Sequence, residues 1–254
     1  EVMLAKSLAA VSLTKSPFSN PGGSAAECKI NGNAIIKKII SSAPDGFMSP
    51  ESVRQILYSA GVPHVRELSI DNMDEIEFAA AALGLPLAMK VSGPVHKSDV
   101  AGVKLNISSA EDAKKRYSEL MKISGAEGVI MQQMTRGIEL FIGAKREPGY
   151  GHIILCGLGG IFVETLKDIS AGIVPVGMDE ALDMIRRLKG YGIINGARGK
   201  AGVNEMRFAE IITGVSSLLA EAPEIREIDF NPLIGEGERI QSVDCRIFID
   251  KTCC

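Results

Sequence analysis

The chain has 254 residues, a formal net charge of -3, and 46% hydrophobic and 23% charged residues. This composition is ordinary for a globular protein, and the slightly acidic balance argues against general binding to nucleic acid or to a membrane surface. Its apolar runs fall short of the roughly 18 residues needed to cross a bilayer. We therefore expect no nucleic-acid partner and no membrane partner.

The cysteines indicate a reducing compartment. The five of them have no metal-site spacing, and their odd number is not a disulfide framework. Two lie in apolar, strand-like runs and two end the chain. Reduced thiols predict a cytoplasmic location.

The N-terminal part, residues 1–45, is expected to be the end of an upstream helix followed by a linker. Residues 12–33 are rich in Ser, Gly, Asn and Pro, which is typical of a linker. Residues 34–41 carry a short helical pattern.

Residues 46–125 are predicted to form a first subdomain in which helices alternate with strands. Ser49 is positioned to cap the first helix, and Asp71 opens the second. Ser108 and Glu111 form a capping box for the third.

Residues 126–254 are predicted to form a second subdomain. The patterns indicate three strands, two helices and a closing hairpin: 128–134, 138–145, 152–157, 179–189, 204–222 and 225–250, with the hairpin turn at 235–237. Helices and strands do not alternate strictly, so the fold class is α+β or α/β, with more than one sheet.

The closing hairpin carries a possible metal site. Asp229 and Asn231 alternate with apolar residues, so they share one face of their strand. Counting across a turn near Gly237 places Asp244 opposite Asn231. Two carboxylates and an amide oxygen are ligands that suit Mg²⁺. The alternative is a solvated hairpin edge.

Lys90 lies inside the apolar strand predicted at 85–91. A buried ammonium needs a partner, which is either a phosphate or a structural carboxylate. The following loop contains Gly93, Lys97 and Gly102, and glycine lets backbone N–H groups approach phosphates closely. The loop is not a P-loop, because GxxxxGK[ST] is absent.

Further along, Gln132, Gln133 and Met134 end a predicted strand. Such a strand end either presents backbone groups to a base or is an ordinary turn. Glu139 alternates with apolar neighbours, so it faces either a site or solvent.

These motifs together resemble the ATP-grasp part of the ADP-forming (NDP-forming) acyl-CoA synthetases, which are relatives of succinyl-CoA synthetase. The resemblance covers about residues 34–249, and the order and spacing of its motifs make it specific. It rests on Met89-Lys90, the segments 96–106 and 157–168, the run Asp229-Phe230-Asn231-Pro232, and Asp244.

The resemblance implies an ATP-grasp fold, in which two α+β subdomains hold ATP or ADP with Mg²⁺ between them. His96 would accept the phosphoryl group during catalysis. The implied nucleotide-binding residues are Lys90, Gly93, Lys97, Gly102, Lys104, Gln132, Gln133, Met134, Glu139 and Arg146, with Gln132 to Met134 as the adenine hinge. The implied metal-binding residues are Asp229, Asn231 and Asp244.

The implied reaction interconverts acid, CoA and ATP with acyl-CoA, ADP and phosphate. CoA-binding and ligase domains would be needed as partners, either upstream in the same polypeptide or on a separate subunit. Two alternatives stay open at this point. One is an ATP-grasp ligase without a phosphohistidine, and the other is a non-catalytic nucleotide-sensing module fused to an acetyltransferase.

Overall fold

The computed structural model describes residues 33–93, 102–160, 167–196 and 201–253. It combines helices with two mainly antiparallel sheets, so the expected α+β class is confirmed. The helices are α2 (Asn33–Ser42), α3 (Pro50–Ser59), α4 (Ile76–Leu83), α5 (Ala110–Leu120), α7 (Met178–Arg186), α8 (Tyr191–Ile194) and α9 (Glu205–Glu221), with 3-10 turns at Met73–Glu75 and Lys251–Cys253. In the described residues, no helix is long and apolar enough to cross a membrane.

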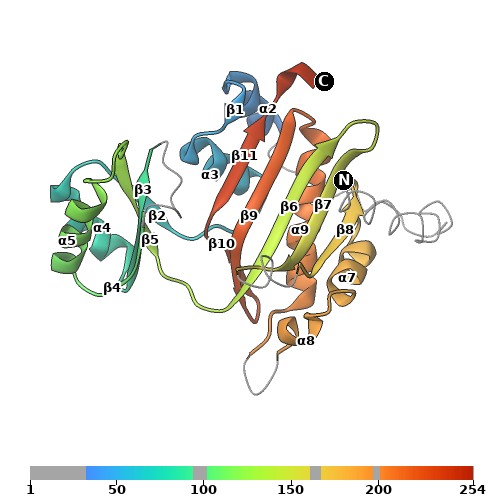
Figure 1. Ribbon diagram of the computed structural model, residues 1–254. Coiled ribbons are helices and arrows are strands. Elements are labelled where there is room, and N and C mark those ends of the chain that lie inside the picture. Colours follow the sequence, from blue (N-terminus) through green and yellow to red (C-terminus); the bar gives the residue numbers. More distant parts are fainter. Residues whose placement is uncertain (1–32, 94–101, 161–166, 197–200, 254) are drawn as a thin grey trace.

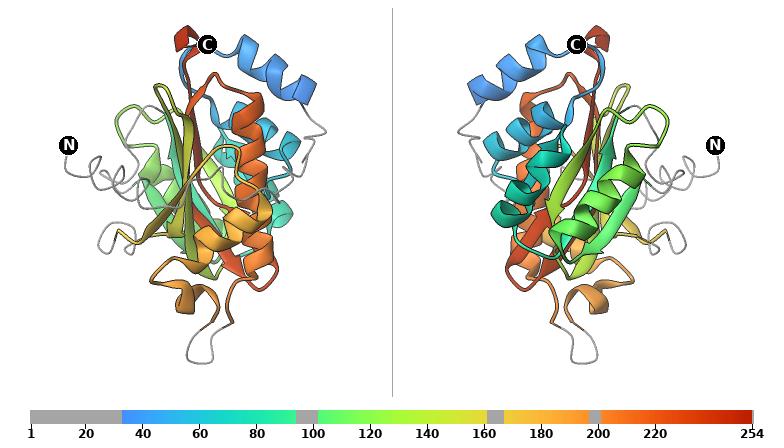
Figure 2. Two further views of the ribbon diagram at one scale, coloured as in Figure 1. Left: turned by 90° about the vertical axis from the view of Figure 1, so that its right-hand side faces the viewer. Right: turned by 90° about the vertical axis from the view of Figure 1, so that its left-hand side faces the viewer.

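The larger sheet has seven strands in the order β1-β11-β9-β6-β7-β8, with β10 paired to β9. Helices α2, α3, α7 and α9 pack against one face of this sheet and share a single apolar core with it. Figures 1 and 2 show α7 and α9 on that face. The strands are β1 (Gly46–Phe47), β6 (Ile138–Glu147), β7 (Gly151–Leu158), β8 (Ile169–Ile173), β9 (Ile225–Glu236), β10 (Arg239–Ser242) and β11 (Cys245–Ile249).

The smaller sheet has four strands in the order β2-β5-β3-β4. Helices α4 and α5 supply its second, separate apolar core, which includes Leu83, Met89 and Leu120. Figure 1 shows this unit beside the β10 and β11 edge of the larger sheet. Its strands are β2 (Glu67–Ile70), β3 (Leu87–Ser92), β4 (Val103–Ile107) and β5 (Gly128–Gln133).

The two cores divide the chain differently from the expected boundary between residues 125 and 126. Strand β1 belongs to the larger sheet and helix α3 to its core, although both precede the smaller unit in the chain. Strand β5 lies in the middle of the smaller sheet, between β2 and β3. The physical reason is that long-range strand pairing, rather than proximity in sequence, decides which core buries a segment.

Helix caps and turns predicted from the sequence lie at or within a few residues of the observed ends of their elements. Ser49 caps α3, and its side chain accepts a hydrogen bond from Ser52 N at 3.3 Å, as expected. The expected cap at Ser108 is wrong by one residue, because Ser109 accepts the bond from Asp112 N that starts α5. The hairpin pairs Glu236 with Arg239, so its turn is Gly237-Glu238 rather than 235–237. Strand β8 and the short helix α8 were not expected from the sequence.

Candidate functional site

The predicted phosphate-binding lysine lies at the contact between the two units. Lys90 is on β3 and is only 8% exposed. Its Nζ donates a hydrogen bond to the carbonyl oxygen of Val243 at 2.9 Å. Val243 lies between β10 and β11, directly before Asp244. The structure therefore brings the lysine of the smaller unit to the predicted metal-binding hairpin of the larger unit.

The same carbonyl receives a second hydrogen bond, from Gln132 of β5. Gln132 Nε2 lies 2.9 Å from Val243 O and 2.6 Å from Glu67 Oε2. Glu67 of β2 also receives a hydrogen bond from Arg54 Nη1 at 2.6 Å, and His64 Nε2 lies 3.3 Å from it. Arg54 belongs to α3, so this network fixes the smaller unit to the larger one at two points.

Glu67 is an ionised carboxylate at neutral pH. Burial by itself raises the pKa of this group, but the neighbouring His64 ring and the hydrogen bonds from Arg54 and Gln132 favour the charged form and lower the pKa to about 2. Glu67 was not predicted from the sequence, because its three partners come from three separate segments.

The hairpin register is the one that the sequence predicted. Ser242 pairs with Leu233, and Cys245 pairs with Phe230. Asp244 continues this register opposite Asn231. In the next pair on the same face, Arg246 lies opposite Asp229. Arg246 was missed, although its position two residues after Asp244 in a strand was a usable signal.

The acidic groups of this face lie near one another. Burial raises the pKa of Asp229, and the neighbouring Asp244 and Glu227 raise it further, while Arg246 lowers it. A bound cation would relieve this repulsion between carboxylates, and carboxylate and amide oxygens are the donors that Mg²⁺ prefers. Within the described ranges, no group of three or more His, Cys, Asp or Glu side chains could hold a metal. The predicted metal-binding set contains only two such side chains, Asp229 and Asp244, and its third oxygen comes from the amide of Asn231.

Gly93 and Gly102 stand at the two ends of the predicted phosphate loop. Gly93 has φ +134°, and a Cβ added there would lie 2.3 Å from Gly125 O, so this position requires glycine. Gly102 is buried, and its carbonyl accepts a hydrogen bond from Val91 N at 2.9 Å. His96 and Lys97, which lie between the two glycines, fall outside the described residues.

The predicted adenine hinge follows the end of β5. Gln132 is 1% exposed and its side chain is bonded within the protein, so this side chain is not available to a base. Gln133 N donates to Arg66 O at 3.0 Å, and Met134 N donates to Pro86 O at 3.3 Å. The adenine contact stays a prediction. It would need backbone groups other than these two N–H groups, or the hydrogen bond from Met134 N to Pro86 O would have to break.

Glu139 lies near the start of β6 and is exposed. Its Oε2 occupies the space where a Cβ on Gly160 would be, and its carbonyl accepts a hydrogen bond from Gly159 N at 2.7 Å. The glycine-rich turn after β7 therefore packs directly against Glu139.

Arg146 lies at the opposite end of β6, roughly 20 Å along the strand from Glu139. Its Nη1 donates to Pro223 O at 3.2 Å, at the C-terminal end of α9. The structure does not bring these two predicted pocket residues together.

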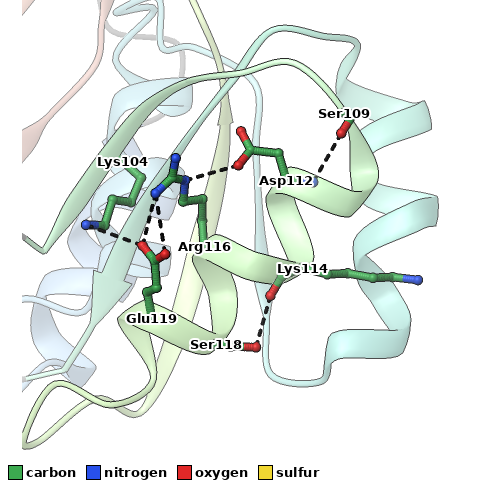
Figure 3. A network of polar contacts seen from close by, with 7 residues as sticks. All are labelled: Lys104, Ser109, Asp112, Lys114, Arg116, Ser118 and Glu119. Carbon is green, nitrogen blue, oxygen red and sulfur yellow. Dashed lines mark hydrogen bonds and ion pairs between the residues drawn. The ribbon is translucent and has the colours of Figure 1, made fainter.

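Lys104 is also separated from Lys90. It pairs across the sheet with Met89, whose side chain is buried under the helices, so Lys104 faces the helical side. Its Nζ lies 3.6 Å from Glu119 Oε2 of α5, which also binds Arg116 (Figure 3). Lys90, the next residue after Met89, points to the opposite face.

Comparison with known proteins identifies the family. A family model described as an ATP-grasp domain matches residues 40–249. The β subunit of acetate–CoA ligase (ADP-forming) I from Pyrococcus furiosus is 37% identical over 213 residues, which cover 80% of this chain and 91% of that subunit. The chain belongs to the ATP-grasp family of ADP-forming acyl-CoA synthetases.

Solved structures of this synthetase family have the same fold. Acetyl-coenzyme A synthetase 1 of Ca. Korarchaeum cryptofilum, in complex with coenzyme A and Ca-AMPCP, matches with a TM-score of 0.78 and 30% identity, over 86% of this chain and 100% of that one. The same enzyme with coenzyme A and Mg-AMPPCP has a TM-score of 0.73 and 30% identity over the same shares, and its phosphohistidine segment points towards the nucleotide binding site. The expected ATP-grasp fold is confirmed.

Some ATP-grasp relatives in this family are much longer. The 4-hydroxybutyrate–CoA ligase (ADP-forming) of Nitrosopumilus maritimus is 35% identical over 209 residues, which cover 76% of this chain but only 30% of that protein. The chain thus corresponds to nearly all of a β subunit and to about a third of a longer ligase.

Proposed function

We propose that this chain is the nucleotide-binding part of an ADP-forming acyl-CoA synthetase, which interconverts acid, CoA and ATP with acyl-CoA, ADP and phosphate. The observation that carries this proposal is the bond from Lys90 Nζ to the carbonyl of Val243. This bond sets the buried ammonium of Lys90 beside the hairpin that carries Asp244. The phosphates of one nucleotide could therefore contact Lys90 and a metal ion held by the hairpin. Phosphoryl transfer needs mainly positioning and charge neutralisation, and this arrangement supplies both.

The predicted residues near this contact then have separate tasks. Lys90 would bind the phosphates, and the loop between Gly93 and Gly102 would lie over them. Glu139 would lie at the nucleotide, and the backbone after β5 would contact the base. Asp229, Asn231 and Asp244 would hold Mg²⁺, which neutralises charge on the phosphates when it is bound.

His96 would carry the phosphoryl group between two sites. In the direction that consumes ATP, a ring nitrogen of His96 forms a bond to the γ-phosphorus while the P–O bond to ADP breaks. ADP leaves with the electron pair of that bond. The phosphoryl group then passes to the acyl-transfer site. The phosphohistidine segment seen in the Ca. Korarchaeum cryptofilum enzyme supports this role.

The acyl-transfer site would belong to CoA-binding and ligase domains outside residues 1–254. Relatives that carry the matching region as a separate β subunit or within a longer polypeptide support this division. We place the enzyme in the cytoplasm, where reduced thiols persist, and the free Cys156 and Cys245 support that placement.

Labelling with Mg-[γ-³²P]ATP tests the proposal. The chain should gain a label that acid removes and base does not, and peptide mapping should place it on His96 rather than on His64 or His152. His96→Ala should abolish the label while Mg-ADP still binds. If wild-type chain binds Mg-ADP but gains no label, the protein is a nucleotide-binding module without a phosphohistidine. If it binds no Mg-ADP, the nucleotide site itself is refuted.

A further inference from the structure

The carbonyl oxygen of Val243 accepts two hydrogen bonds from the smaller unit. One comes from the ammonium of Lys90 and the other from the amide of Gln132, each at 2.9 Å. A carbonyl oxygen has two lone pairs, so both of its acceptor positions are filled. If Lys90 turns to a phosphate, Gln132 is the donor that stays.

Glu67 fixes the orientation of that amide. Gln132 Nε2 lies between two acceptors, Glu67 Oε2 at 2.6 Å and Val243 O at 2.9 Å. Reversing the amide would turn its oxygen towards both acceptors and lose both bonds. Glu67 is itself held by Arg54 Nη1 at 2.6 Å, and only 7% of its side chain is exposed.

The segment that carries Val243 is held tightly on its N-terminal side. Ser242 N donates to Pro63 O at 2.8 Å, and Ser242 O accepts from Val65 N at 3.0 Å. Val243 N donates to Pro232 O at 3.0 Å. The carbonyl of Val243 is the next backbone group along the chain, and it directly precedes Asp244.

We propose that Glu67 is a positioning residue for nucleotide binding: by holding the Gln132 amide on the Val243 carbonyl, it keeps Asp244 in place while Lys90 turns to a nucleotide phosphate. This inference rests on the proposed function. Without the amide, the departure of Lys90 would leave a partly buried carbonyl with no donor, and this penalty would oppose phosphate binding. The effect should therefore depend on the phosphates of the ligand.

The test compares Mg-ADP with adenosine, which has no phosphate to attract Lys90. Calorimetry of the full chain gives the Mg-ADP affinity, and ligand-observed NMR gives the weaker adenosine affinity. Glu67→Gln should weaken Mg-ADP binding about tenfold and leave adenosine binding within about twofold of wild type. Glu67→Asp, which keeps the carboxylate, should recover part of the loss.

Glu77→Gln is the matched control. It makes the same chemical change on α4 of the same unit, where Glu77 pairs with the exposed Lys114. This variant should bind both ligands as the wild type does.

Gln132→Leu provides a second route if Glu67→Gln folds poorly. It removes the amide, keeps a similar volume and leaves unchanged the backbone after β5 that would contact the base, so it should weaken Mg-ADP binding selectively in the same way. The proposal is overturned if Mg-ADP affinity is unchanged in both variants, or if Mg-ADP and adenosine weaken alike. Absence of Mg-ADP binding by the wild type would instead refute the proposed function along with this inference.

Discussion

Glu67 and Asp229 are both partly buried carboxylates on strands, but the protein shifts their pKa values in opposite directions. Burial raises the pKa of each group. At Glu67 the nearby His64 ring and the donors Arg54 and Gln132 reverse this effect and lower the pKa to about 2. At Asp229 the neighbouring Asp244 and Glu227 add to it, and only Arg246 opposes it.

The difference separates a structural network from the predicted metal site. The surroundings of Glu67 already satisfy its charge, so this group stabilises the contact between the two units. The surroundings of Asp229 leave negative charge that a cation could neutralise, because the hairpin brings carboxylates together. Burial raises the pKa of Cys245 as well, and the nearby Asp244 and Asp229 add to this rise.

The largest effect should come from Asp244→Asn, which removes one carboxylate from the acidic face. We expect Mg-ADP affinity to fall on the order of a hundredfold, because a direct metal ligand should matter at least as much as its outer-shell partners. Thermal unfolding without ligand should be nearly unchanged, since no donor of the Glu67 network is touched. Calorimetry with Mg-ADP measures the affinity.

Glu227→Gln is the control for charge alone, because Glu227 lies on β9 near Asp229 but is exposed and is no predicted ligand. It should change Mg-ADP affinity less than about threefold, as an exposed charge is worth little. Equal affinities of Asp244→Asn and wild type would remove Asp244 from the metal site.

The second effect separates the two carboxylates by stability. Glu67→Gln should lower the free energy of unfolding at pH 7 by roughly 2 kcal/mol, because it weakens a buried network of charged hydrogen bonds. Asp229→Asn should change it by less than about 1 kcal/mol or stabilise the protein, because it removes repulsion. Urea unfolding without Mg²⁺ measures both values. A larger loss for Asp229→Asn than for Glu67→Gln would reverse the assignment of the two regions.

The smallest effect concerns acid. The folded pKa of Glu67, about 2, lies below its ordinary value of 4.5, so its contribution is present above pH 4.5 and is lost as the pH falls towards 2. At pH 4 this group should contribute about 1 kcal/mol less than at pH 7. Urea unfolding at both pH values should give a smaller acid loss in Glu67→Gln than in wild type. Equal losses in the two proteins would mean that Glu67 is not held in its charged form.

Local features were predictable from the sequence because neighbours along the chain set them. The Ser49 cap, the helix after Asn204 and the hairpin register around Asn231 depend on residues close in sequence, or on two arms joined by a tight turn. Because an antiparallel hairpin has a fixed register, counting from its turn is enough to place side chains on a face. The motifs from Lys90 to Asp244 also carried the family resemblance.

The tertiary structure alone decided which of these residues meet. Lys90 and Val243 are far apart in sequence, and no local rule indicates that a backbone carbonyl would receive the lysine. The role of Glu67 depends on the packing of α3, β2 and β5 against one another. Lys104 faces away from Lys90, because alternate residues of paired strands face opposite sides of the sheet. Such contacts depend on long-range pairing of strands, which the pattern of single segments does not encode.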